Sequence, residues 1–369
     1  MAWIRWIGVL GLSSICLGAQ AQLLIGQTAG ITGAVAATMN EAIQGARLYI
    51  DHVNAKGGIA GEKIELITLD DQFDVKQAAE NARVLIEEKK VLALFLNRGT
   101  PHTEAIMPLL VKHDIALIGP STGAMVLHQP VKRQIFNVRS SYQREAKRAV
   151  EHLATVSVTR IAVVHVDDTF GQDALAGTME GLKATNIQPM AVLKFDRAKP
   201  DFGTLIAELT KLNPQAIVWI GSGTAVSDGI KALRAAGGNA QIITLSNNAS
   251  SGFIKNLGTA SRGVMVTQVL PYERSSTHAF LVEARELASK QKGLELSPAM
   301  LEGFVSAKVL VEALRIASPK VTRTKIIDAL NSMRKFDVGG LEVSYSPTDH
   351  SGLDYVDLSI IGNDGRFKR

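Results

Sequence analysis

The chain has 369 residues, of which 46% are hydrophobic and 20% are charged. This composition excludes a disordered chain, and the length allows two or three domains. The net charge of +5 comes from 40 basic and 35 acidic residues that are spread along the chain, so no clustered basic surface points to nucleic acid as a partner.

The first 21 residues have the pattern of a secretion signal. Arg5 is their only charge, Trp6–Gly18 is apolar or small, and Ala19–Ala21 supplies the small residues of a signal-peptidase site. The apolar stretch is shorter than the roughly 20 residues that a membrane span needs. We predict cleavage after residue 21, export to the periplasm and loss of Cys16, the only cysteine of the chain. Lipidation of Cys16 is the weaker alternative, because a bulky residue precedes it.

After the signal, short β-branched stretches alternate with amphipathic ones. The predicted strands are 23–27, 63–69, 91–96, 115–118, 160–166, 190–195, 216–220 and 241–245. The predicted helices among them are 39–54, 75–88, 103–112, 170–184, 202–211 and 226–236. Two longer helices, 277–292 and 298–317, and two strands, 341–345 and 355–361, follow. This alternation indicates βαβ units with parallel sheets, and the two successive series predict an α/β protein with two doubly wound lobes.

The short motifs for catalysis or cofactor binding are incomplete. Gly119–Gly123 matches the G-x-S-x-G pattern of serine hydrolases, but Pro130 follows too soon for the helix that the pattern requires. Gly221–Gly223 lacks the third glycine of a dinucleotide site, and the eight histidines show no spacing of metal ligands. We therefore predict no cofactor and no metal, and a hydrolase that uses Ser121 is the weaker alternative.

Polar groups follow two neighbouring predicted strands. Thr100, which precedes a proline, is typical of an N-cap, and the amide groups of a helix start attract anions. Arg98 adds a positive charge beside it, and Ser121 and Thr122 follow the next strand. Because ligands of open α/β sheets bind outside the carboxyl ends of the strands, these loops predict a carboxylate site. Ordinary helix capping is the alternative for Thr100.

Short motifs in one consistent order extend over nearly the whole chain after residue 21. They are Asn54–Ile59, Asp70–Asp71, Gly119–Thr122, Asp168–Gly171, Asp201–Phe202, Arg234–Gly237 and Gly263–Thr267. Together they resemble the periplasmic leucine/isoleucine/valine-binding protein family, the type I solute-binding proteins of ABC transporters.

The resemblance implies two Rossmann-like lobes joined by three crossing segments. Lobe 1 would comprise residues 22–141 and 271–347, and lobe 2 residues 142–270 and 348–369. It also implies a monomer whose hinge closes on a small-molecule ligand and which then delivers the ligand to an ABC-transporter permease. A ligand-sensing receptor of the same fold is the alternative.

The resemblance also implies which positions contact the ligand. Thr100, Ser121 and Thr122 correspond to the family's carboxylate-binding loops, although Gly123 stands where a further threonine is expected. The remaining positions are Thr38, where the family often has an aromatic residue, Phe170, where a tyrosine is usual, Gly223 or Thr224, where another tyrosine is usual, and Tyr142 at the first crossing. Small residues at Thr38 and Gly223 predict room for a bulky ligand.

One departure from the family concerns the ligand's amino group. Ser246 falls where amino-acid binders carry an acidic residue that pairs with the ammonium group. A buried ammonium without a counter-charge is costly, so an α-amino acid is poorly served unless Glu302 or Asp167 substitutes. We therefore expect a carboxylate ligand, aromatic or aliphatic, and a branched-chain amino acid remains the family default.

Overall fold

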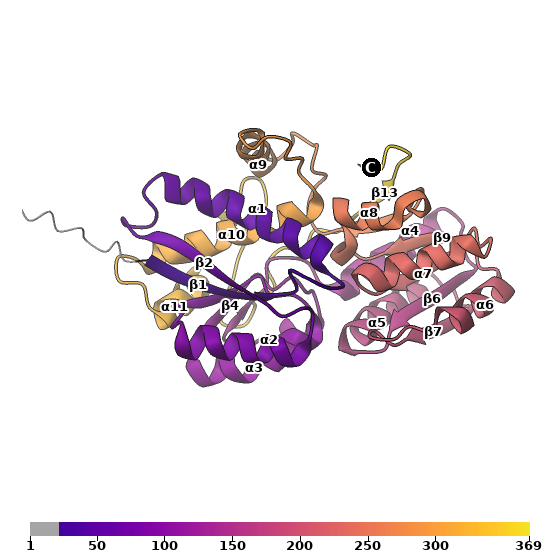
Figure 1. The fold of residues 1–369 in the computed structure, drawn as a ribbon, viewed down its shortest axis with the longest axis horizontal. Coiled ribbons are helices and arrows are strands. Elements are labelled where there is room, and N and C mark those ends of the chain that lie inside the picture. The colour runs from indigo at the N-terminus through magenta and orange to yellow at the C-terminus, as the bar shows by residue number, and fades with distance from the viewer. Residues whose placement is uncertain (1–21) are drawn as a thin grey trace, which may run out of the picture.

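The computed structural model describes residues 22–369, so the predicted signal and Cys16 lie outside the described residues. Two α/β lobes lie side by side along the long axis of the molecule (Figure 1). None of the helices formed by residues 22–369 is long and apolar enough to cross a membrane. The arrangement of strands and helices confirms the fold that the sequence predicts, an α/β protein with two doubly wound lobes.

The first lobe is built on a parallel sheet with the strand order β2-β1-β3-β4-β5. Its strands are β1 (Gln22–Ala29), β2 (Lys63–Asp70), β3 (Ala93–Phe95), β4 (Ala116–Ile118) and β5 (Ile135–Phe136). Its helices are α1 (Ala36–Ala55), α2 (Val75–Arg83), α3 (Thr100–His113), α9 (Ala279–Ser289), α10 (Pro298–Ala317) and α11 (Arg323–Ser332). The lobe also contains a short antiparallel hairpin of β11 (Phe336–Asp337) and β12 (Glu342–Val343). Alternate strand residues face two apolar clusters, one under α1 and α10 and one under α2 and α3.

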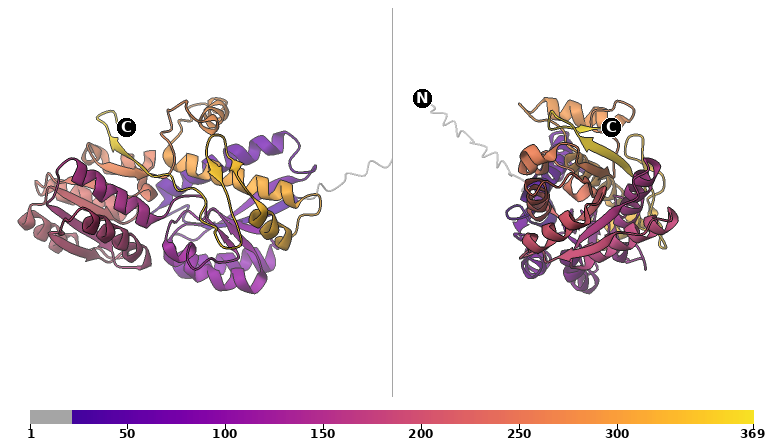
Figure 2. Two further views of the ribbon diagram at one scale, coloured as in Figure 1. Left: turned by 180° about the vertical axis from the view of Figure 1, so that it is seen from behind. Right: turned by 90° about the vertical axis from the view of Figure 1, so that its right-hand side faces the viewer.

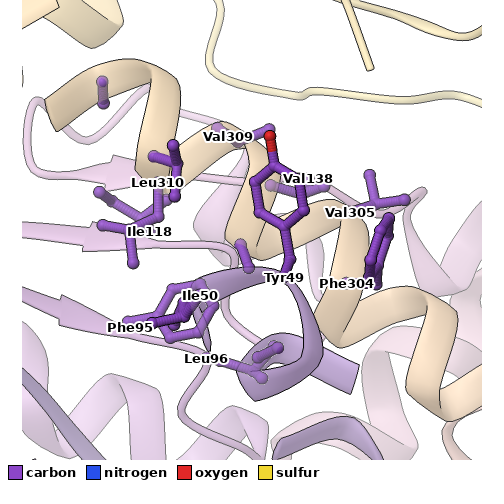
Figure 3. Packing of buried hydrophobic residues seen from close by; sticks show 14 of the residues in the cluster. Tyr49, Ile50, Phe95, Leu96, Ile118, Val138, Phe304, Val305, Val309 and Leu310 are labelled. Carbon is purple, nitrogen blue, oxygen red and sulfur yellow. The ribbon is translucent and has the colours of Figure 1, made fainter. Parts of the chain in front are cut away.

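The packing of α1 against α10 brings the late part of the chain into this lobe. Tyr49 and Phe304 meet edge to face with their ring centroids 5.2 Å apart (Figure 3). A Cβ atom on Gly303 would lie only 1.8 Å from the carbonyl oxygen of Ala42, so glycine lets the two helix backbones approach closely. The residue before Gly303 is Glu302, and this close approach of the two helices keeps it buried.

The second lobe has the strand order β14-β13-β10-β9-β8-β6-β7. Its parallel strands are β6 (Ile161–Val166), β7 (Ala191–Phe195), β8 (Ala216–Ile220), β9 (Gln241–Thr244) and β10 (Met265–Gln268). The end of the chain adds β13 (Asp357–Ile361) and β14 (Phe367–Lys368), which pair antiparallel. The helices are α4 (Tyr142–Thr155), α5 (Thr169–Ala184), α6 (Phe202–Leu212), α7 (Gly223–Ala235) and α8 (Ser251–Leu257).

The chain passes between the two sheets after β5, after β10 and after β12, and Figure 2 shows the last passage from behind. The lobe boundaries predicted at residues 141, 270 and 347 stay a prediction. The helices α4, α8 and α11 and the strands β5, β10, β11 and β14 lie outside the predicted set. α4 begins at Tyr142 because the Ser141 hydroxyl accepts a hydrogen bond from the Arg144 amide, a capping signal that the polar sequence around it obscures.

Candidate functional site

A small enclosed cavity of about 10 Å³ lies between the two lobes, which is room for about one water molecule. Strand-end loops of both lobes surround it: Arg98, Thr100 and Ser121 come from the first lobe, and Phe170, Ser222 and Asn247 from the second. Larger hollows elsewhere, such as one of about 490 Å³ beside α4, are open to solvent. Because strand-end loops of both sheets converge at the small cavity, it is the candidate site.

The two loops that carry the predicted hydroxyl groups lie side by side. Arg98 and Ser121 form an isolated parallel bridge, and the Ser121 amide donates to the Asn97 carbonyl at 2.7 Å. The hydroxyl groups of Thr100 and Thr122 are 2.8 Å apart. Thr100 is the first residue of α3 and not its N-cap, a correction to the sequence prediction, because Gly99 takes the cap position with φ of 96°. The helix start still faces the cavity as expected.

Arg98 is the most unusual of these groups, because it is a buried cation without a carboxylate. Its side chain is only 3% exposed, and its guanidinium donates to the Asn247 carbonyl across the cleft. No carboxylate of residues 22–369 lies within ion-pair distance of it. Burial therefore lowers the pKa of Arg98, although Tyr142 and Glu302 oppose that change. A buried charge of this kind is costly unless an anion pairs with it.

In the loop after β4, Ser121 has a free hydroxyl group, whereas Gly123 has no space for a side chain. The Ser121 hydroxyl is buried and has no hydrogen-bond partner among the described residues, which is rare for a buried polar group. A Cβ atom on Gly123 would lie 2.5 Å from the Ser140 carbonyl oxygen. The first crossing segment therefore occupies the space where the family's extra threonine is expected.

Arg139, the other fully buried arginine of residues 22–369, is paired with carboxylates, although its Nη1 atom makes no hydrogen bond. It donates to the Glu145 carboxylate and to the Ser246 hydroxyl, and it lies 3.6 Å from Glu302. Burial acts to lower the pKa of Arg139, but the carboxylates of Glu302 and Glu145 outweigh it and the pKa is raised. Glu145 also accepts from the Ser246 amide at 3.0 Å and from the Thr267 hydroxyl. Ser246 thus belongs to this network, and its side chain does not line the cavity.

Aromatic rings form the remaining wall. The rings of Tyr142 and Phe170 lie 4.7 Å apart, and burial raises the pKa of Tyr142. The Arg197 guanidinium lies 5.2 Å from the Phe73 ring centroid and bonds the Asp168 carboxylate at 2.7 Å. The charge of Arg197 is therefore neutralised, whereas that of Arg98 is not.

Phe73 was missed by the sequence reasoning. Its φ of 61° is unusual for a bulky residue, and the turn that holds it is fixed by the Asp71 carboxylate, which accepts from the Phe73 amide at 2.9 Å. The ring stacks on His102 with centroids 4.2 Å apart. His102 is a buried residue of helix α3, and burial lowers its pKa to about 4. A large apolar residue inside the polar turn after a strand is the signal that could have identified Phe73.

Thr38 and Gly223 contact the opposite lobe and do not line the cavity. The Thr38 hydroxyl lies 2.9 Å from that of Ser250. A Cβ atom on Gly223 would lie 1.9 Å from the Ala34 carbonyl oxygen, which accepts from the Thr224 amide at 3.0 Å. The room that these two small residues predicted is thus filled by contacts between the lobes.

The structure brings together five of the predicted residues around the cavity: Arg98, Thr100, Ser121, Tyr142 and Phe170. Thr122 lies behind Thr100, and Thr38, Gly223 and Ser246 lie elsewhere in the contact between the lobes. Five further cavity residues were missed, namely Phe73, Gly99, Arg197, Ser222 and Asn247.

Comparison with known proteins gives consistent results. A sequence model for a family described as periplasmic binding protein matches residues 22–363. The leucine-specific-binding protein of Salmonella typhimurium is 25% identical over 261 residues, which are 70% of this chain and 70% of that protein. A substrate-binding periplasmic protein from Ralstonia solanacearum is 32% identical and superposes with a TM-score of 0.87 over 94% of this chain and 99% of its own. A possible leucine/isoleucine/valine-binding protein from Rhodopirellula baltica is 25% identical, with a TM-score of 0.86 over 95% of this chain and 97% of its own.

Proposed function

We propose that this chain, which belongs to the periplasmic binding protein family, captures a small carboxylate between its lobes and delivers it to the permease of an ABC transporter. The observation that carries the proposal is Arg98, a buried guanidinium at the cleft that has no carboxylate partner among the described residues. A ligand carboxylate would supply the missing anion.

The other groups around the cavity are suited to the same ligand. The unpartnered Ser121 hydroxyl would donate to the carboxylate, and so would the amide groups at the start of α3. Arg98 would exchange the neutral Asn247 carbonyl for a charged acceptor, which gives a stronger hydrogen bond. Because these donors lie on one lobe and Asn247 and Phe170 on the other, a ligand that contacts both sides favours the closed arrangement.

The relatives and the N-terminal sequence support the proposed location and role of the protein. Proteins named for leucine binding and for periplasmic substrate binding are similar to this chain over most of its length. Together with the signal pattern of residues 1–21, they support export to the periplasm. Cleavage after Ala21 and action as a monomer are further parts of the proposal. The lobes are then free to present a closed surface to a membrane permease.

A binding screen tests the proposal. Amino acids, aromatic acids and short aliphatic carboxylates are added to the purified protein in a thermal-shift assay, and hits are measured by calorimetry. Ser121→Ala should weaken binding of a hit about tenfold, because a hydrogen bond to a charged group contributes roughly 1.5–3 kcal/mol. Arg98→Met should weaken it about 100-fold or more, and Arg133→Met, at an exposed arginine paired with Asp114, is the control.

Two results would contradict the proposal: no carboxylate in the screen stabilises the protein, or Arg98→Met binds the hit as tightly as the control variant does.

The hydrolase alternative has no structural support, because no base of residues 22–369 bonds the Ser121 hydroxyl and such a nucleophile requires one. A receptor of the same fold would pass the same binding tests, and dependence of uptake on the permease distinguishes transport from sensing.

A further inference from the structure

One buried hydrogen-bond acceptor at the cavity lacks a partner. Asn247 is 2% exposed and lines the cavity from the second lobe, and its Oδ1 atom makes no hydrogen bond with any of residues 22–369. A buried polar atom in this state is costly and rare. The Oδ1 atoms of Asn97 and Asn137 also lack a partner among these residues, but neither asparagine lines the cavity. Asn247 is therefore the asparagine whose free acceptor a ligand in the cavity can meet.

The other atom of the side-chain amide fixes how Asn247 is oriented. Its Nδ2 atom donates to the Gly221 carbonyl at 2.9 Å and to the Ser222 hydroxyl at 3.0 Å. Because a carbonyl oxygen can only accept, turning the amide by 180° would place Oδ1 against the Gly221 oxygen. The neighbouring Asn248 is different, since its Oδ1 atom accepts from the Gly223 amide at 2.9 Å and its Nδ2 atom donates to Gly221 at 3.0 Å. Asn248 thus supports the loop, whereas Asn247 keeps an acceptor in reserve.

This free acceptor lies beside the proposed position of the ligand carboxylate. Arg98, which would pair with the carboxylate, donates to the backbone carbonyl of Asn247 itself. A donor on the carbon atom next to the carboxylate would therefore be close to the Asn247 side chain. The cavity of about 10 Å³ has room for about one water molecule. A ligand that displaces an ordered water at Oδ1 loses affinity unless it replaces the hydrogen bond.

The charges around the cavity favour a neutral donor over an ammonium group. Among residues 22–369, those that line the cavity include Arg98 and Arg197 but no aspartate or glutamate. Asp168 is bonded to the Arg197 guanidinium at 2.7 Å, and Glu302 faces Arg139. An ammonium group next to the carboxylate would lie beside the positive charge of Arg98, with a neutral amide oxygen as its acceptor. That arrangement is unfavourable in a buried site, and a hydroxyl group avoids it.

We infer that Asn247 determines the ligand specificity of the cleft, and that the ligand is a carboxylate with a neutral hydrogen-bond donor beside it, foremost a 2-hydroxy acid. This inference rests on the proposed function and narrows its ligand class. The carboxylate binds on the Arg98 side, and the hydroxyl group on the next carbon atom donates to the Oδ1 atom of Asn247. An acid without the hydroxyl group leaves that buried acceptor without a partner, which costs affinity.

Calorimetry with two matched sets of probes tests the inference. One set is propanoate, lactate and alanine, and the other is 4-methylpentanoate, 2-hydroxy-4-methylpentanoate and leucine, with both enantiomers of each hydroxy acid. The members of a set differ only in the group beside the carboxylate. In at least one set, the hydroxy acid should bind to the wild-type protein about tenfold or more tightly than the other two members, because only it satisfies the free acceptor without adding a positive charge.

Asn247→Ala should remove the advantage of the hydroxy acid over the acid without the hydroxyl group. The ratio of the two affinities is measured in one variant, so a general disturbance of the loop cancels from it. Asn256→Ala, at an exposed asparagine of α8, is the matched control and should keep the full advantage. The wild-type comparison alone decides the inference should Asn247→Ala neither fold nor bind.

The outcomes separate the two proposals. If the wild-type protein binds the acid without the hydroxyl group as tightly, or the amino acid more tightly, the inference is wrong and the carboxylate function stands. The same holds if Asn247→Ala keeps the full advantage, or if the wider screen gives only carboxylates that carry no neutral donor. If no carboxylate binds at all, both proposals are wrong.

Discussion

At the scale of single residues, the two fully buried arginines have opposite relations to stability. Arg139 holds Glu145 and Glu302 in the interior, so its removal would leave two buried carboxylates without their cation. Arg98 has no such partner among residues 22–369 and donates to a carbonyl group. A buried ion without a partner destabilises the fold, and we propose that Arg98 serves to bind the ligand.

We therefore expect Arg139→Met to lower the free energy of unfolding by about 3–5 kcal/mol, the usual loss when one partner of a buried ion pair is removed. Arg98→Met should leave it unchanged or raise it, while ligand binding is lost. Urea unfolding of both variants without added ligand measures this. An equal loss of stability in the two variants would contradict the assignment of Arg98 to the ligand.

We expect Glu273 to make the free energy of unfolding depend on pH. Its side chain is buried between β10 and α9 near Leu294 and Leu296, and burial raises its pKa from 4.5 to about 7. The folded protein keeps this proton up to about pH 7, whereas the unfolded chain releases it near pH 4.5. The free energy of unfolding should therefore fall as the pH rises through that interval.

Glu273→Gln should remove that contribution and stabilise the protein by about 3–4 kcal/mol at pH 8, since each pKa unit corresponds to about 1.4 kcal/mol. At pH 4 it should have little effect. Chemical unfolding from pH 4 to 8 measures the difference, with Glu286→Gln on the exposed side of α9 as the control. A constant difference across this range would show that Glu273 does not titrate as described.

At the scale of elements, α7 is bounded by two glycines with positive φ, and only one of them touches the other lobe. Gly223, the first residue of α7, has φ of 57° and leaves space for the Ala34 carbonyl. Gly237, just after α7, has φ of 81° and nothing within 4 Å of its Cβ position. Substitutions at these two glycines therefore distinguish the effect of backbone strain from the effect of blocking the contact between the lobes.

Alanine at either position should cost roughly 1–2 kcal/mol of folding stability, because left-handed backbone is unfavourable for residues with a Cβ atom. Only Gly223→Ala should also weaken ligand binding, since its Cβ atom would hold the lobes apart. Calorimetry with a ligand from the screen and unfolding curves of both variants measure the two effects. Equal affinity in Gly223→Ala and Gly237→Ala would show that this contact is not needed for closure.

At the scale of the whole molecule, polar contacts bridge the lobes at several separate points. The Glu41 carboxylate accepts from the amides of Ser251 and Gly252, and the Thr169 hydroxyl donates to Glu104 at 2.6 Å. Because their acceptors are carboxylates, hydrogen bonds of this kind contribute roughly 1.5–3 kcal/mol each. These contacts favour the closed arrangement, and under the proposed function a ligand that contacts both lobes favours it further.

Small-angle scattering should accordingly show a smaller radius of gyration when a ligand from the screen is added to the wild-type protein. The same ligand at 100 times its dissociation constant should add about 2.7 kcal/mol to the free energy of unfolding. Arg98→Met should show neither change at that concentration. Identical scattering with and without a ligand that calorimetry shows to bind would contradict closure of the lobes on it.

The sequence by itself determined the α/β class, the two lobes and the convergence of the two polar strand-end loops of the first lobe, because these depend on local patterns. Apolar periodicity decides strand or helix, and parallel strands bring their following loops to one edge, which is why Arg98, Thr100 and Ser121 were found. Phe73 escaped because its role depends on an unusual φ, and α4 because its apolar face lies within a mostly polar stretch.

Only the tertiary structure decided which charges at the cleft are satisfied. Arg98, Arg139 and Glu302 lie far apart in sequence, and their partners depend on the packing of α10 on α1 and on the passage of the chain between the lobes. The sequence left Asp167 and Glu302 as equal candidates for the ammonium group, and the fold placed one on the surface with Lys194 and the other in the interior. Ion pairing is a long-range property of the fold, because it depends on distances and burial that no local pattern encodes.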